Sequence, residues 1–214
     1  MVLSIEERIK GFLFSPSETF DNSKDDTLGD SLTYFVVVLA IFAAIFGTFY
    51  AIYLAMFLPV ITRIIASIPG TSMPPFMAAM GPLIGLLFFV LFFVLILVVG
   101  IIAAFIGGLW THIWVYLVGG RRGVAQTIKA VMYGLTPSFL LTPILPWALI
   151  VQVIGIRQLQ ELSTGRAILA VILAIIIPAI IIGAIFAAYI PTMPMLRPGP
   201  GLGPGPGPGH MIRP

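Results

Sequence analysis

The chain alternates between polar segments and long apolar runs, and the first apolar run is the clearest. Leu32–Leu58 contains no charged residue in its 27 positions. At ~1.5 Å per residue it makes a helix of ~40 Å, enough to cross a ~30 Å hydrocarbon core with some tilt. We expect Pro59 to end this helix. Residues 59–81 then form an external loop close to the lipid headgroups.

Two further runs predict membrane spans. Pro82–Val118 is longer than one hydrocarbon core requires, but no polar or turn residue divides it, so it predicts a single helix that projects beyond the core. Trp110, Trp114 and Tyr116 near its end are typical of an interfacial aromatic belt. Ile168–Ile190 predicts the last span.

The segment between these spans predicts a helical hairpin. Val124–Leu145 is interrupted by Pro137 and Pro143, and Trp147–Leu162 follows it, with a turn around residues 142–146. We favour two complete crossings, which gives five spans in all. A re-entrant hairpin is the alternative, since irregular backbone is tolerated at membrane depth where protein buries it.

The two ends of the chain are different in character. Residues 1–31 form a polar lead-in, where Ser4 and Glu7 fit a capping box and start a short amphipathic helix that Pro16 stops. We expect this helix to lie in the membrane interface, with packing on the rest of the protein as the alternative. Residues 21–30 predict a solvated loop. Residues 191–214 form a Pro/Gly tail that predicts disorder.

Composition supports a fold in the bilayer. Of the 214 residues, 59% are hydrophobic and 9% charged, against roughly 25% charged in a soluble domain. The stretch from Leu32 to Gln160 holds no carboxylate, and there is no cysteine. The basic residues are scattered singly, which argues against nucleic-acid binding. The predicted fold class is all-α, an integral membrane helical bundle of residues 32–190.

The distribution of basic residues predicts the orientation. With the N-terminus in the cytoplasm, eight of the eleven basic residues fall on or near the cytoplasmic side and three outside. This bias follows the positive-inside rule and predicts a multi-pass protein with an exterior C-terminus. The cytoplasmic set is Arg8, Lys10, Lys24, Arg121, Arg122, Lys129, Arg157 and Arg166.

Residues that carry catalysis are scarce, and we predict no enzyme, no metal site and no cofactor. His112 lies in an aromatic segment without metal-ligating neighbours, and Ser138 has no nearby base to activate it. Arg157 and Glu161 are four positions apart and are expected to pair on one helix face. The glycine pairs at 107–108 and 119–120 indicate close helix contacts or a helix stop.

Three segments carry a resemblance to a known family. They are FLFSPSETF (Phe12–Phe20), YGLTP (Tyr133–Pro137) and GIRQLQELSTGRA (Gly155–Ala167). In order and spacing they resemble the motifs of the Yip domain family of Rab-GTPase-interacting membrane proteins, over about residues 12–190. The resemblance implies five transmembrane helices, a cytoplasmic N-terminus and an exterior C-terminus. Eukaryotic members are implied to recruit GTPases through long N-terminal regions, whereas this chain is similar to the short archaeal or bacterial type.

We therefore expect a non-enzymatic membrane adaptor or scaffold that meets membrane lipid and a protein partner at its cytoplasmic face. A permease, a lipid-handling component and an accessory subunit of a larger complex are the alternatives, and a homo-oligomer stays open. The candidate partner or lipid contacts are Phe12, Phe14, Pro16, Arg121, Arg122, Arg157, Glu161 and Arg166. The candidate structural or cavity residues are Tyr133, Pro137, Ser138, Gln152 and Gly155, and a permease would line a polar cavity with Tyr133, Thr136, Ser138 and Gln152.

Overall fold

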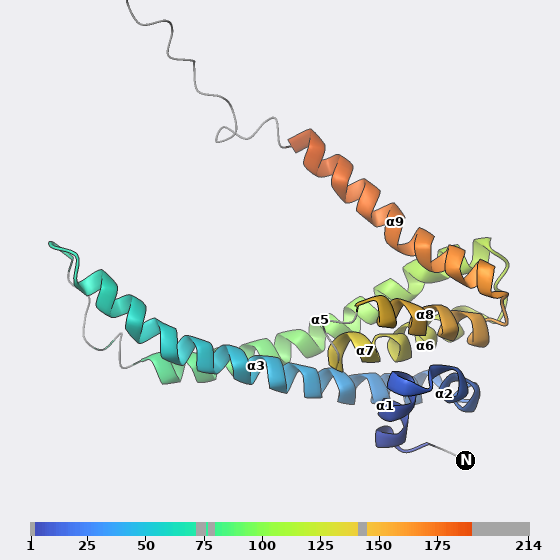
Figure 1. The fold of residues 1–214 in the computed structure, drawn as a ribbon, viewed down its shortest axis with the longest axis horizontal. Coiled ribbons are helices and arrows are strands. Elements are labelled where there is room, and N and C mark those ends of the chain that lie inside the picture. Colours follow the sequence, from blue (N-terminus) through green and yellow to red (C-terminus); the bar gives the residue numbers. More distant parts are fainter. Residues whose placement is uncertain (1–2, 72–75, 77–79, 141–144, 190–214) are drawn as a thin grey trace, which may run out of the picture. The chain divides into compact units, whose positions relative to one another are not determined.

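The computed structural model describes residues 3–71, 76, 80–140 and 145–189, and every regular element in these ranges is a helix (Figure 1). The expected turn around residues 142–146 and the Pro/Gly tail lie wholly or largely outside the described residues. The helices are α1 (Ile5–Phe14), α2 (Pro16–Asn22), α3 (Leu28–Ala66), α5 (Gly81–Leu117), α6 (Val124–Gly134), α7 (Thr136–Leu140), α8 (Leu145–Leu159) and α9 (Thr164–Tyr189).

Three of the helices, α3, α5 and α9, are long and apolar enough to cross a membrane. α5 is one uninterrupted helix of 37 residues, which confirms the single long helix expected from Pro82–Val118. α8 runs over Leu145–Leu159, and it, α6 and α7 are shorter, so the expected count of five spans is not confirmed.

The end expected for the first span is wrong. α3 passes through Pro59 and continues to Ala66. Proline is tolerated inside such helices because neighbouring groups satisfy the freed backbone. The carbonyl that Pro59 frees is that of Ala55, four positions earlier, and it faces α5, where a Cβ added at Gly81 would lie 3.3 Å from its oxygen. At its start α3 also reaches further than expected, because Thr27 and Asp30 form a capping box.

The chain divides into two compact units, Met1–Ala174 and Ile175–Pro214. In the first unit, α1 and α2 pack on each other and on α7 and α8, and α6 packs against α3, α5 and α8. The second unit begins within α9, and its described residues continue that helix to Tyr189 with exposed apolar side chains such as Ile180 and Phe186.

α3 and α5 pack as an antiparallel pair in the first unit. A Cβ added at Gly85 would lie 2.7 Å from the Ala51 carbonyl oxygen, and one at Gly100 would lie 2.6 Å from Leu39 Cδ2. As the position rises along α5, its partner on α3 falls. Small residues that let helix backbones approach are typical of membrane helix pairs, where packing replaces the hydrophobic effect as the driving force.

We expect Gly85→Ala to destabilise this pair by about 1–3 kcal/mol, because the new methyl group meets a backbone atom that cannot move aside cheaply. Gly107→Ala is the matched control on the same helix, since a Cβ there meets nothing within 4 Å. Thermal unfolding in mild detergent should show a lower midpoint for Gly85→Ala alone. Equal midpoints for the two variants would contradict the close packing.

Candidate functional site

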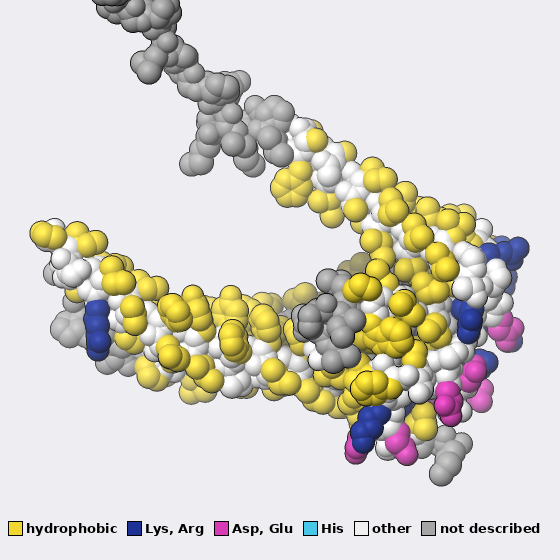
Figure 2. Space-filling model, in the orientation of Figure 1, with side chains coloured by type: hydrophobic (Ala, Val, Ile, Leu, Met, Phe, Trp, Pro, Cys, Tyr) yellow, Lys and Arg dark blue, Asp and Glu magenta, His cyan; other side chains and the backbone are white. Residues whose placement is uncertain are grey.

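Charged side chains gather at one end of the first unit. We call this region the charged layer: α1, α2, residues 23–27, and the turns at 118–123 and 160–163. Figure 2 shows Lys, Arg, Asp and Glu side chains clustered around α1, α2 and the helix ends beside them, whereas the remainder of α3 carries mainly hydrophobic side chains and one basic residue, Arg63, in its last turn. The sequence predicts that charge gathers at one boundary of the membrane, and the candidate site lies in this charged layer.

The N-terminal helix begins as the sequence predicts. The Ser4 side chain accepts from the Glu7 backbone, and the Glu7 carboxylate accepts from the Ser4 backbone at 2.8 Å. These bonds lower the pKa of the Glu7 carboxyl. The helix packs on the protein through its inner face, which is the alternative considered for it, and its polar residue Arg8 is buried.

A buried polar group ties this helix to the hairpin. We call it the Asp26 cluster: Arg8, Asp26, Lys129 and Tyr133. The Arg8 guanidinium donates to both oxygens of Asp26, with Nη2 at 3.0 Å from Oδ1, and the Tyr133 hydroxyl donates to Oδ2 at 2.5 Å. Burial works against the Arg8 charge, but Asp26 and Tyr133 outweigh it and raise the pKa of Arg8. The expected solvated loop therefore carries a buried anchor.

Lys129 completes the cluster. Its side chain is buried, and Nζ donates to the carbonyl oxygens of Lys24 at 2.9 Å and Asp26 at 2.6 Å. A buried ammonium is tolerated only where its donors are satisfied, and here two backbone carbonyls supply that. Lys129 thus fixes the path of the loop between α2 and α3.

The three segments that carried the family resemblance meet beneath this cluster. The Phe12 ring stacks on Tyr133 at 4.7 Å and meets Phe20 edge-on at 4.8 Å. A Cβ at Gly155 would lie 2.5 Å from the Phe20 ring, so a side chain there would force the ring to move. Phe12 and Pro16 are buried, which corrects their assignment as partner contacts. Phe14 has 76% of its surface exposed, and its contact with a partner stays a prediction.

The residues expected at a polar cavity have other roles. Tyr133 is fully buried in the cluster, and the Thr136 hydroxyl lies 3.0 Å from that of Tyr34. Pro137 is buried in α7, just after the break that ends α6 at Gly134. Ser138 is half-buried on the same short helix.

The end of α8 forms a Schellman turn. Leu162 N–H donates to the Arg157 carbonyl and Glu161 N–H to the Gln158 carbonyl, with Glu161 at φ 53°. Because Glu161 lies beyond the helix, the expected pair with Arg157 is wrong. Glu161 pairs with Arg122 instead, and Arg157 Nη2 lies 3.4 Å from Ser17 Oγ.

Gln160, which sequence reasoning did not select, joins the two arms of the hairpin. Its amide nitrogen donates to the Gly123 carbonyl at 2.8 Å and to Thr127 Oγ1 at 2.9 Å, and its oxygen accepts from Arg122 N–H at 3.1 Å. His112 Nδ1 lies 2.8 Å from the same threonine hydroxyl, as a packed histidine would. In the sequence, the one sign of this role was that Gln160 is a polar residue within the segment Gly155–Ala167, which carries the family resemblance.

The glycine pair after α5 is a helix stop, as expected. Gly119 at φ 105° and Gly120 donate to the carbonyls of Tyr116 and Val115. Arg121 then turns back, so that its guanidinium lies 4.0 Å from the centre of the Tyr116 ring. Arg166 is exposed at the start of α9. The other glycine pair contributes a close contact, since a Cβ at Gly108 would lie 2.8 Å from Ile128.

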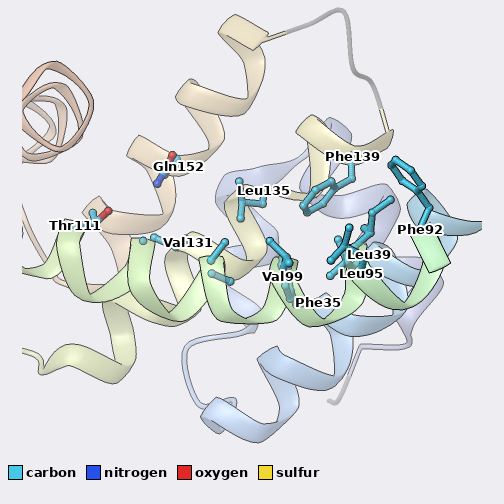
Figure 3. Close-up of a pocket in the computed structure, with 15 residues that line it drawn as sticks. Phe35, Leu39, Phe92, Leu95, Val99, Thr111, Val131, Leu135, Phe139 and Gln152 are labelled. Carbon is cyan, nitrogen blue, oxygen red and sulfur yellow. The ribbon is translucent and has the colours of Figure 1, made fainter. Parts of the chain in front are cut away.

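An apolar pocket of about 610 Å³ lies between α3, α5, α6, α7 and α8. Thr111 and Gln152 lie at one end of it and Phe92 at the other (Figure 3). Of the four residues expected at a permease cavity, only Gln152 lines it. The lining set is Phe35, Leu39, Phe92, Leu95, Ile96, Val99, Gly100, Ala103, Ala104, Gly107, Thr111, Val131, Leu135, Phe139 and Gln152.

The described residues contain no group of three or more His, Cys, Asp or Glu side chains placed to hold a metal ion. The site therefore offers charge, hydrogen-bond donors and an apolar pocket.

We expect Asp26→Asn to destabilise the protein by about 3–5 kcal/mol, because it leaves the Arg8 charge buried without a counter-charge. Tyr133→Phe should cost about 1–3 kcal/mol, because the hydroxyl donates to Asp26 and accepts from Arg8. Asp21→Asn is the matched control, since its pair with Lys24 is exposed and is worth at most about 1 kcal/mol. Thermal unfolding in detergent measures all three. Equal effects of Asp26→Asn and Asp21→Asn would contradict the anchor.

Comparison with protein-family models, with curated proteins and with solved structures finds no match for this chain. The resemblance to the Yip domain family accordingly stays a prediction, carried by the three segments that meet at Phe12, Tyr133 and Gly155.

Proposed function

We propose that this chain is a non-enzymatic membrane adaptor that presents its charged layer to a protein partner on the cytoplasmic side. The carrying observation is that the layer is held rigidly by the buried Asp26 cluster yet exposes Phe14. A rigid element that displays an aromatic side chain beside charged groups suits binding, because little conformational entropy is lost on association.

Helix length supports three spans and a re-entrant hairpin. α6 has 11 residues and α8 has 15, which makes ~16 Å and ~22 Å, less than a ~30 Å hydrocarbon core. The hydrogen bonds from Gln160 to Gly123 and Thr127 hold the two open ends of the hairpin together. This topology keeps the N-terminus and the basic turns in the cytoplasm and the C-terminus outside, as the positive-inside rule favours.

Cysteine accessibility tests this topology, since the chain has no native cysteine. We expect Ser67→Cys to react with a membrane-impermeant maleimide applied to intact cells. Pro146→Cys, on the hairpin, should stay unlabelled from outside, and Ser163→Cys should react only once the cytoplasmic side is opened. Labelling of Pro146→Cys from outside at the rate of Ser67→Cys would contradict the re-entrant hairpin and support five spans.

The partner surface is expected on the outer face of α1 and α2. Phe14 is exposed there, and Arg157 approaches Ser17 of α2 from the end of α8. Arg121 and Arg166 directly follow or begin a span, so we place them at the headgroups, where each contributes about 1 kcal/mol of attraction to anionic lipid. Deleting residues 1–20 would remove Arg8 and Phe12 from the core, so point variants are the better test.

In-cell crosslinking followed by purification and quantitative mass spectrometry should recover a protein near one-to-one with the wild-type chain. The double variant Phe14→Ser and Arg157→Glu should lose it at least tenfold, since it removes an exposed anchor and reverses a charge. The control, Phe76→Ser with Arg63→Glu, makes the same two changes outside the charged layer and should retain it. Loss in both variants, or recovery of lipid alone, would contradict the adaptor.

Lipid handling is the second candidate, and the apolar pocket favours it. At about 610 Å³ the pocket falls in the range of small-molecule sites, and its lining is almost wholly apolar apart from Thr111 and Gln152. A permease for polar solutes fits this pocket poorly, because a water-soluble substrate would lose its hydration there without replacement hydrogen bonds.

A further inference from the structure

A second pocket, polar and smaller, lies within the charged layer. It encloses about 210 Å³ between the loop after α2, the start of α6 and the end of α8. It is separate from the apolar pocket and shares no residue with it. The lining residues are Lys24, Asp25, Arg122, Gln126, Gln158, Leu159 and Glu161.

Three hydrogen-bond acceptors in this pocket have no partner among the described residues. The side-chain oxygens of Gln126 and Gln158 are shielded from solvent and bond to no described atom. The Gln158 amide is fixed by its nitrogen, which donates to Ser17 Oγ at 2.7 Å. Asp25 adds an exposed carboxylate, which makes no hydrogen bond or ion pair with a described residue and whose charge also acts on the buried Lys129. Shielded oxygens without donors are costly, and so they indicate a ligand that brings N–H groups.

The same pocket carries two cations with donors to spare. Arg122 pairs with Glu161, and Lys24 pairs with Asp21 at 2.6 Å. A guanidinium has five N–H donors and an ammonium three, so each keeps free donors after its ion pair is made. Both groups are established binders of phosphate oxygens. The pocket therefore offers donors for an anion and acceptors for a cation.

We propose that this pocket binds a primary aminoalkyl phosphate. The three N–H groups of a primary ammonium match the oxygens of Gln126, Gln158 and Asp25, and the phosphate is held by Arg122 and Lys24. The group is available as the ethanolamine phosphate headgroup of a membrane lipid or as free phosphoethanolamine. Arg122 follows a membrane helix within a few residues, which places the pocket near headgroup depth. The inference does not rest on the adaptor proposal, whose test varies Phe14 and Arg157.

Calorimetric titration of the full chain in detergent with phosphoethanolamine tests the pocket, with phosphocholine as the paired probe. Phosphocholine carries the same charges but its ammonium has no N–H to donate. We expect phosphoethanolamine to bind at least tenfold more tightly.

Native mass spectrometry of the chain from nanodiscs that mix phosphatidylethanolamine with phosphatidylcholine identifies the source of the ligand. Selective retention of phosphatidylethanolamine assigns the lipid, and binding of free phosphoethanolamine without retention of that lipid assigns the soluble molecule.

Variants locate the binding. Asp25→Asn and the pair Gln126→Leu with Gln158→Leu should each weaken phosphoethanolamine binding about tenfold or more, the loss of a charge-assisted hydrogen bond. Glu18→Gln, on α2 but outside the pocket, is the control and should bind like the wild type. Gln126→Glu guards against misfolding, because it keeps an oxygen at the same place and should tighten binding. No binding by the wild type, equal binding of the two probes, or equal loss in Glu18→Gln would overturn the proposal.

Discussion

The carboxylate of Asp26 is the point at which three separate parts of the chain are joined. The carboxylate binds Arg8 of α1 and Tyr133 of α6, and the backbone carbonyl of Asp26 accepts a hydrogen bond from Lys129. Each of these charges would be costly to bury alone, and together they satisfy one another. Because α1 is fixed in this way, Phe12 reaches the Tyr133 ring and Phe20 reaches Gly155. The lead-in is consequently part of the fold and not an appendage to it.

The lengths of the spans set a second constraint. α3 has 39 residues and α5 has 37, which makes ~58 Å and ~55 Å, well beyond a ~30 Å hydrocarbon core. The buried residues of α3 are concentrated in its first half, from Ser31 to Gly47, where α6 and α7 also pack on it. The remaining length is covered by α5 and otherwise exposes apolar side chains.

Local patterns predicted what local forces determine. The capping box at Ser4, the stop at Gly119 and the continuity of α5 each depend on neighbouring residues, and each is confirmed. The buried role of Arg8 could not be predicted in this way, because its partner Tyr133 lies 125 positions away. Pro59 misled for a related reason: its usual cost to a helix depends on what surrounds the freed carbonyl. The hydrogen bonds that Gln160 makes and the two pockets depend on tertiary packing, which local patterns do not reveal.

Glu161 shows how a local cost can be understood from its surroundings. A left-handed conformation costs a residue with a side chain about 1–2 kcal/mol, and the equivalent position after α5 is occupied by Gly119. The pair with Arg122 is exposed, with 60% of the Glu161 side chain accessible, so it returns at most about 1 kcal/mol. Stability alone therefore favours glycine. A carboxylate at this position instead pairs with the Arg122 guanidinium at the polar pocket, where the proposed phosphate would bind.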